Sequence, residues 1–139
     1  MQIRGACHCG NVAFELEWPD HVPVATRECG CTFCQKHGAE WTANPHASLH
    51  VRVANTSLVS MHRFGTNTAD FHVCARCGVV TLCTSDIEGH QYAVVNTRAF
   101  EHRSMLSPPA PVDFEGEEED ARLRRRARNW IGHVVIEAV

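Results

Sequence analysis

The sequence lacks a long hydrophobic run and an excess of basic charge, and it contains only one lysine and one tyrosine. No stretch approaches the roughly 18 consecutive apolar residues of a membrane-spanning helix, so we expect no membrane segment. The formal net charge of -3, with histidines neutral, argues against a nucleic-acid-binding protein held mainly by phosphate contacts. With 139 residues, 44% of them hydrophobic, the chain has the size and composition of one domain with a modest core.

Several sequence motifs of common enzyme classes are also missing. The chain contains no H-E-x-x-H, no glycine-rich phosphate loop and no G-x-S-x-G, so hydrolytic triads and nucleotide chemistry have no support. The first residues, Met-Gln-Ile-Arg-Gly, do not form the apolar core of a signal peptide. We therefore expect a soluble, cytoplasmic protein whose thiols are kept reduced.

Cysteine is abundant, with eight residues in 139. Seven of the eight stand in tight clusters of C-x-C, C-x-C-x-x-C and C-x-x-C spacing, namely Cys7 and Cys9; Cys29, Cys31 and Cys34; and Cys74 and Cys77. Disulfide frameworks link cysteines that are distant in the sequence, whereas spacings of two and three residues bring sulfur atoms to one side of a turn, as zinc ligands require. The pattern predicts metal sites rather than disulfides.

The two cysteine pairs suffice for one closed four-thiolate zinc site, and we assign Cys7, Cys9, Cys74 and Cys77 to it. Spacing alone does not force this pairing, because Cys29 and Cys31 could also pair with Cys74 and Cys77.

The remaining triplet, Cys29, Cys31 and Cys34, predicts a second zinc with an open fourth position, which is typical of catalytic sites. One alternative is that Cys83 completes a second all-cysteine site and nothing is catalytic. Another is that Cys83, in the apolar run 79–84, is a buried free thiol.

Alternating apolar residues and turn signals predict a mainly β protein. A Gly-Asn turn at 10–11 precedes a half-buried strand at 12–16, and a short helical turn at 32–37 should stop at Gly38. Further strands are expected at 22–27, 49–53, 58–64, 71–73, 79–84 and 91–96, with a loop at 85–89.

The segment beyond about residue 100 has a different character. Residues 107–111 predict a stiff extended linker, and acidic and arginine-rich runs then predict a solvated amphipathic helix from about Glu117 to Asn129, followed by a terminal strand at 133–139. Its stabilising ion pairs are expected at Glu118–Arg122 and Asp120–Arg124. The apolar stripe assigned to this helix comprises Leu123, Ala127, Trp130, Ile131, Val134 and Val135.

Three stretches together resemble a known family. They are Gly-Ala-Cys-His-Cys-Gly-Asn-Val-Ala-Phe-Glu at 5–15, Cys-Gly-Cys-Thr-Phe-Cys-Gln-Lys-His-Gly-Ala at 29–39 and Cys-Ala-Arg-Cys-Gly at 74–78, with Val-Asn-Thr-Arg at 95–98. Their order, spacing and flanks are similar to the glutathione-dependent formaldehyde-activating enzyme family, which includes centromere protein V. The resemblance covers about residues 3–100 and leaves about 101–139 as a C-terminal extension of one zinc-binding domain at 1–139.

The resemblance implies a mostly antiparallel β-tent fold with two zinc ions per chain. It implies a structural zinc at Cys7, Cys9, Cys74 and Cys77, and a catalytic zinc at Cys29, Cys31 and Cys34, which resolves the pairing left open by spacing.

The activity implied by the resemblance is the condensation of formaldehyde with glutathione to S-hydroxymethylglutathione, a carbon–sulfur lyase reaction in reverse. The expected partners are thus a small-molecule thiol and an aldehyde. The contrasting hypothesis is a non-catalytic binding module stapled by two structural zinc ions, in which the arginine-rich helix makes the contacts.

Overall fold

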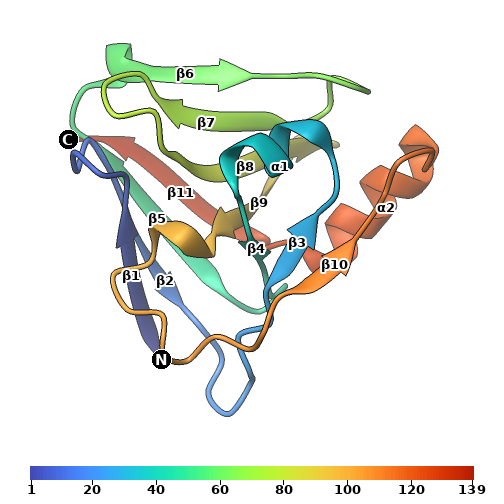
Figure 1. The fold of residues 1–139 in the computed structure, drawn as a ribbon, viewed down its shortest axis with the longest axis horizontal. Helices are drawn as coiled ribbons and strands as arrows, with labels where there is room; N and C mark the ends of the chain where they lie inside the picture. The colour runs from blue at the N-terminus through green and yellow to red at the C-terminus, as the bar shows by residue number, and fades with distance from the viewer.

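The computed structural model describes residues 1–139 as two β-sheets with two short α-helices beside them (Figure 1). The smaller sheet has the strand order β1 (Gln2–Ala6), β2 (Val12–Glu17), β5 (Ser48–Val53) and β11 (His133–Ala138). The larger sheet has the order β10 (Ala110–Val112), β3 (Arg27–Cys29), β4 (Trp41–Thr42), β9 (His90–Asn96), β8 (Val80–Ile87), β7 (Asp70–Cys74) and β6 (Val59–His62). The helices are α1 (Thr32–His37) and α2 (Glu119–Asn129), with 3-10 turns η1 (Thr56–Leu58) and η2 (Thr97–Ala99).

The expectation of a mainly β protein is confirmed; both sheets are mixed, and most of their strand pairings are antiparallel. Of the nine strand pairings, β10–β3 and β11–β5 are parallel and the other seven are antiparallel. Both parallel strands come from the C-terminal third of the chain, which adds an outer strand to each sheet. No helix has both the length and the apolar character needed to cross a membrane.

The main core lies between the two sheets. Phe14 and Leu16 of β2 and Leu49 of β5 point inward from the smaller sheet and meet Leu82 and Val95 of the larger sheet, all with at most 2% of their surface exposed. Along β5, intermediate and buried residues alternate strictly, because successive side chains of a strand point to opposite faces. This period-two pattern is the signal from which the strand is predicted.

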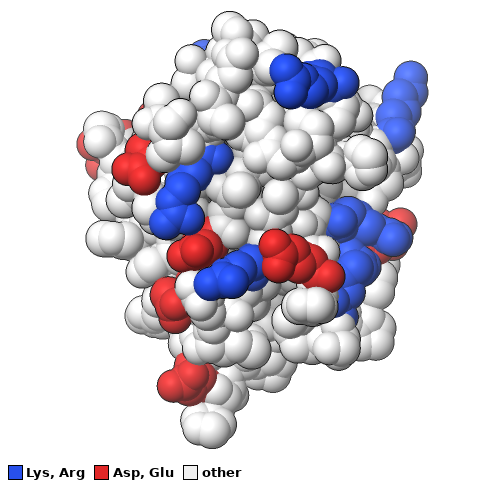
Figure 2. All heavy atoms as spheres, turned by 90° about the vertical axis from the view of Figure 1, so that its left-hand side faces the viewer, with Lys and Arg blue, Asp and Glu red and all other residues white.

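The outward side of the smaller sheet carries charges of both signs. Glu15 of β2 forms ion pairs with Arg4 of β1 and Arg52 of β5, and Arg52 also reaches Glu137 of β11. Figure 2 likewise shows basic and acidic side chains interspersed on the face that it draws. The charges on this side of the smaller sheet are therefore paired across neighbouring strands.

The central strands β8 and β9 of the larger sheet are mostly buried on both faces, and the second face supports the cysteine triplet. A separate apolar cluster on that face includes Cys34, Trp41, Cys83, Val94 and Trp130. Helix α1 contacts β3, and α2 contacts β8. The two helices therefore lie over this face, with space for a site between them and the sheet.

Two local predictions are confirmed by the backbone. Gly10, with a φ of 83°, forms the turn of the β1–β2 hairpin. Helix α1 ends at Gly38, which takes the left-handed conformation with a φ of 63° and donates its N–H to the carbonyl oxygens of Cys34 and Gln35. Glycine adopts positive φ without a Cβ penalty, so both positions are legible in the sequence.

Three predicted elements differ in the structure. Residues 22–27 do not form a strand: Val24 makes one isolated bridge to Leu106, and β3 begins only at Arg27. The loop expected at 85–89 is a tight turn, because β8 continues to Ile87. Only the last two residues of the linker expected at 107–111 enter a strand, because β10 begins at Ala110 and pairs with β3.

The C-terminal prediction is right about the elements and wrong about their contacts. A helix forms at Glu119–Asn129 and a strand at His133–Ala138. The apolar stripe does not stay on the helix, because Trp130 and Ile131 follow it and Val134 and Val135 belong to β11. The expected i,i+4 pairs are replaced by ion pairs from Glu117, just before the helix, to its arginines.

Candidate metal centres and their cavity

The first candidate centre is a four-cysteine cluster formed by Cys7, Cys9, Cys74 and Cys77. All four Sγ atoms lie within 4.8 Å of one another, with 3.7 Å between Cys7 and Cys9 and 3.6 Å between Cys9 and Cys74. A tetrahedral zinc with Zn–S bonds of about 2.3 Å places its sulfur atoms about 3.8 Å apart. The spacing and the donor set therefore fit a tetrahedral zinc ion.

Two turns from different sheets bring these thiols together. Cys7 and Cys9 lie in the β1–β2 turn, where the backbone N–H of Val12 donates to the Cys7 sulfur at 3.3 Å. Cys74 ends β7, and the N–H of Gly78 donates to its carbonyl oxygen at 2.7 Å. The cluster thus joins the smaller sheet to the larger one.

The ionisation of this cluster is shared unequally among its thiols. Burial raises the pKa of Cys7 to about 11. For Cys77, burial also favours the neutral thiol, but donors that include the backbone N–H groups of Val79 and Cys9 outweigh it and lower the pKa to about 6. Binding of a cation to all four sulfurs therefore releases protons, since thiolates are the ligands.

The second candidate centre is a three-cysteine cluster formed by Cys29, Cys31 and Cys34, whose Sγ atoms also lie within 4.8 Å of one another. Cys29 ends β3, Cys31 caps α1 and Cys34 is on the helix. The Cys31 sulfur accepts the backbone N–H of Cys34 at 3.4 Å. A six-residue segment therefore supplies all three sulfurs.

Hydrogen bonds hold a shared negative charge on this cluster. A hydrogen bond from the Cys34 thiol lowers the pKa of Cys29 to about 5, despite the opposing effect of burial. The same bond, together with burial, raises the pKa of Cys34, and burial raises that of Cys31. The indole Nε1 of Trp41 donates to the Cys34 sulfur at 3.3 Å, which fixes the position of the least accessible thiol.

Cys83 does not join either cluster. It lies on β8 in the apolar cluster behind the triplet and is 2% exposed. Burial raises its pKa, so its thiol stays protonated at neutral pH. Of the two alternatives for Cys83, the structure shows the buried free thiol.

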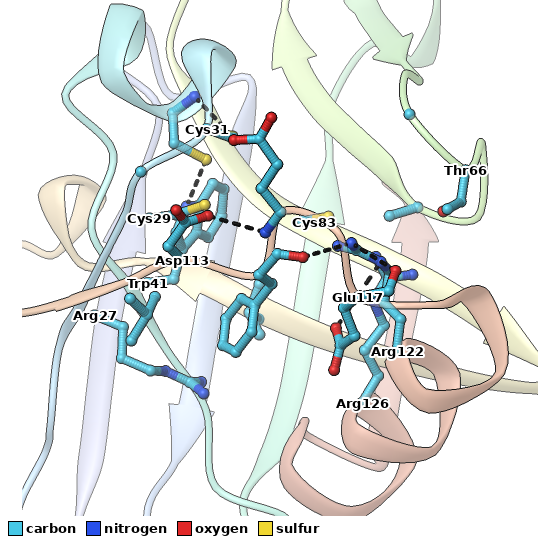
Figure 3. A pocket seen from close by; sticks show the side chains of 18 of the residues that line it. Arg27, Cys29, Cys31, Trp41, Thr66, Cys83, Asp113, Glu117, Arg122 and Arg126 are labelled. Carbon is cyan, nitrogen blue, oxygen red and sulfur yellow. Dashed lines mark hydrogen bonds and ion pairs between the residues drawn. The ribbon is translucent and has the colours of Figure 1, made fainter.

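A cavity of about 540 Å³ adjoins the three-cysteine cluster. Trp41, Phe64 and Phe71 form apolar parts of its wall, and Cys83 lies deeper. Figure 3 shows Cys29 and Cys31 at one end and the start of α2 at the other. None of the four-cysteine cluster lines this cavity, so only the triplet is accessible to a small molecule held there.

The cavity also contains arginines that the sequence prediction placed in solvent. Arg122, Arg125 and Arg126 of α2 line it together with Arg27 of β3. The first three stand at i, i+3 and i+4, the spacing of one helix face, and that signal was available in the sequence. The sequence alone does not single out this face, because acidic residues near the start of the helix and an apolar stripe along it also predict a helix with its arginines in solvent.

Comparisons with known proteins agree with this arrangement. The family model described as "Glutathione-dependent formaldehyde-activating enzyme" matches residues 2–115. A Halomonas elongata protein named "Putative glutathione-dependent formaldehyde-activating enzyme" is 26% identical over 88 residues, which are 55% of this chain and 52% of that protein. The chain thus matches about half the length of that curated relative.

A solved structure has a similar fold. The crystal structure of a Rhodobacter sphaeroides protein is similar with a TM-score of 0.53 and 27% identity, covering 73% of this chain and 90% of that chain. The family model spans most of the sequence, including every cysteine of the four-cysteine and three-cysteine clusters. The chain therefore belongs to the glutathione-dependent formaldehyde-activating enzyme family.

Proposed function

We propose that the protein promotes the addition of a thiol such as glutathione to formaldehyde or a related small aldehyde, as a carbon–sulfur lyase-like enzyme with two zinc ions. One observation carries the proposal: the three-cysteine cluster borders a cavity, whereas the four-cysteine cluster does not. A closed four-thiolate zinc stabilises a fold, and a zinc with three protein ligands keeps a position for chemistry. The family supports the choice of thiol and aldehyde.

The size and lining of the cavity suit a small organic substrate. Its volume of about 540 Å³ lies within the roughly 300–1,000 Å³ of typical ligand pockets. Trp41, Phe64 and Phe71 contribute apolar surface, which limits the access of water and strengthens electrostatic interactions at the reacting atoms.

The reaction joins the thiol sulfur to the aldehyde carbon. The carbon–oxygen π bond breaks, and the thiol proton ends on the former carbonyl oxygen, so no oxidant or reductant is needed. Zinc bound at Cys29, Cys31 and Cys34 would supply Lewis acidity and lower the pKa of a bound water or thiol.

The protein's own side chains position the metal ligands. Trp41 donates its indole N–H to the Cys34 sulfur, and the N–H of Cys34 itself donates to the Cys31 sulfur. Such donors hold ligating atoms in place and tune their basicity. Cys34 and Trp41 also pack in the apolar cluster on the second face of the larger sheet. These contacts keep the Cys34 side of the site rigid.

The contrasting hypothesis of a purely structural zinc module requires a fourth protein ligand at the triplet. The position of Cys83 outside the cluster weighs against it. X-ray absorption on the zinc-loaded chain distinguishes the two: one zinc with four sulfurs and one with three sulfurs plus a light atom support the enzyme. Two four-sulfur zinc sites would favour the module.

The activity is tested by NMR exchange spectroscopy of formaldehyde with glutathione. Wild-type protein should accelerate the exchange, and Cys31→Ser should abolish the acceleration, because it removes a ligand of the open zinc. Lys36→Gln, an exposed change on the same helix, serves as the control. Equal exchange rates for wild type and Cys31→Ser would refute the proposed activity.

A further inference from the structure

The cavity beside the three-cysteine cluster is lined by several cationic side chains. Four guanidinium groups line it, those of Arg27 on β3 and of Arg122, Arg125 and Arg126 on α2. Figure 3 shows Arg27 on one side and Arg122 and Arg126 on the other, with the segment from Asp113 to Glu117 between them. Arg27 lies within the residues that the family model matches, whereas helix α2 follows the last of them.

Two of the four arginines, Arg122 and Arg125, share the single carboxylate of Glu117 within the chain. Arg125 forms a two-pronged ion pair with Glu117, at 3.1–3.2 Å, and its guanidinium lies 3.6 Å from the ring centroid of Phe114. Arg122 donates to two backbone carbonyls, those of Phe114 and Glu117. Its Nε is buried without a hydrogen-bond partner and stays 3.9 Å from the Glu117 carboxylate.

Arg126 is the most unusual of the four, because it is 7% exposed. Its Nη1 donates to the carbonyl and hydroxyl oxygens of Thr68 at 3.3 and 2.9 Å and to the Ser85 hydroxyl at 3.1 Å. These acceptors are all neutral, and its buried Nε has no partner. A buried charge without a counter-charge is costly, so this guanidinium is held ready for an anion that the chain does not provide.

Arg27 approaches the same space from the sheet. It lies two residues before Cys29 on β3, is partly buried and has no acidic side chain beside it. Asp113 instead lies beside Cys29 in Figure 3, and its negative charge favours the neutral form of the Cys29 thiol, which acts to raise its pKa. The chain's own ion pairs therefore leave guanidinium charge in the cavity, because Arg122 and Arg125 share Glu117 while Arg27 and Arg126 form no ion pair.

We propose that Arg27, Arg122 and Arg126 form an anion subsite that holds a carboxylate of the substrate while its sulfur reaches the three-cysteine cluster. The substrate class is then a thiol, or its aldehyde adduct, that carries a carboxylate at a distance from the sulfur. Small neutral thiols lack the group that these arginines recognise. This inference rests on the proposed function, since it assigns the substrate class of the same site.

Guanidinium groups suit this task better than ammonium groups. They present planar, paired N–H donors that match the two oxygens of a carboxylate, and such charge-assisted bonds are stronger than neutral ones. Arg126 is further oriented by three hydrogen bonds at Nη1. This restraint reduces the entropy lost when the anion binds.

The test compares glutathione with its diethyl ester in the exchange assay, using the zinc-loaded full chain. Arg27→Gln and Arg126→Gln should each raise the KM for glutathione about tenfold or more, as expected for one lost charge-assisted hydrogen bond. The KM for the ester, which has no carboxylate, should not rise, and kcat should change little. Arg124→Gln removes the same charge from an exposed position of α2 and should leave both KM values unchanged.

A binding measurement separates this inference from the activity itself. Calorimetric titration with S-methylglutathione, which has both carboxylates but no free thiol, should show binding to wild type that Arg27→Gln weakens about tenfold or more. Arg27 forms no ion pair within the chain, so its replacement should not impair folding. Arg126→Lys keeps the positive charge but lacks the planar guanidinium, and it tests whether charge alone is enough to bind the anion. Equal binding by wild type, Arg27→Gln and Arg124→Gln would overturn the subsite even if exchange activity is present. Absence of exchange with retained, Arg27-dependent binding would instead overturn only the catalytic role.

Discussion

The two cysteine clusters have similar spacing but opposite settings. The four-cysteine cluster draws two thiols from each of two turns, one in each sheet, so its sulfurs surround a point. The three-cysteine cluster comes from one six-residue segment between β3 and α1, so its sulfurs approach from one side and the other side faces the cavity. The comparison teaches that the number of contributing segments, more than the ligand type, decides whether a thiol site is closed or open.

The two settings also predict different consequences for the fold. The four-cysteine cluster links elements that are about 65 residues apart in the chain, as in the contact between Cys9 and Cys74. Metal bound there would contribute directly to folding free energy, because the unfolded chain has no preformed site. The three-cysteine cluster spans a short loop, so a metal bound to it would constrain little of the chain.

The largest expected effect follows from breaking the closed cluster. Cys77→Ser should cost on the order of 5 kcal/mol of unfolding free energy or leave the chain unfolded, since it removes one of four ligands of a structural metal. Cys31→Ser, in the open cluster, should cost only about 1–2 kcal/mol, comparable to an ordinary point change. Circular dichroism melts measure both variants.

Cys31→Ser is a cleaner partner in this comparison than Cys34→Ser. Cys34 is buried and accepts a hydrogen bond from Trp41, so its replacement also disturbs packing. Similar melting temperatures for Cys77→Ser and Cys31→Ser would contradict the division into a structural and a catalytic site.

An intermediate effect is expected from the donor that supports the open cluster. Trp41→Phe removes the indole N–H that reaches the Cys34 sulfur, and zinc affinity at this cluster should fall about tenfold or more. Competition with a chromophoric chelator measures the affinity. Trp18→Phe is the matched control, because it removes a buried indole N–H bonded to the carbonyl of Val22. If Trp18→Phe weakens zinc binding equally, Trp41 has no specific role.

The smallest effect is expected at the eighth cysteine. Burial raises the pKa of Cys83, so the thiol stays protonated and makes a poor ligand at neutral pH. Cys83→Ala should keep two zinc ions per chain and cost about 1 kcal/mol through lost packing. Metal analysis of the purified variant provides the measurement. A preparation with only one zinc would show that Cys83 closes the second site.

Features governed by local rules could be predicted from the sequence. The hairpin at Gly10 and the end of α1 at Gly38 follow from positive φ angles that glycine tolerates. Strand β5 follows from its alternating pattern. The expected strand at 22–27 failed because apolar residues alone do not create a partner: within it only Val24, bridged to Leu106, and Arg27, the first residue of β3, find one.

The sequence by itself determined the cysteine clusters, the local turns that shape them and the mainly β character, because each depends on neighbours a few residues apart. Only the tertiary structure decided that Cys83 stays outside the triplet and that the arginines of α2 face a cavity. Arg126, for example, is oriented by Thr68 and Ser85, which lie 58 and 41 residues away. Helical periodicity shows which residues share a face, but the packing of distant strands determines what that face meets.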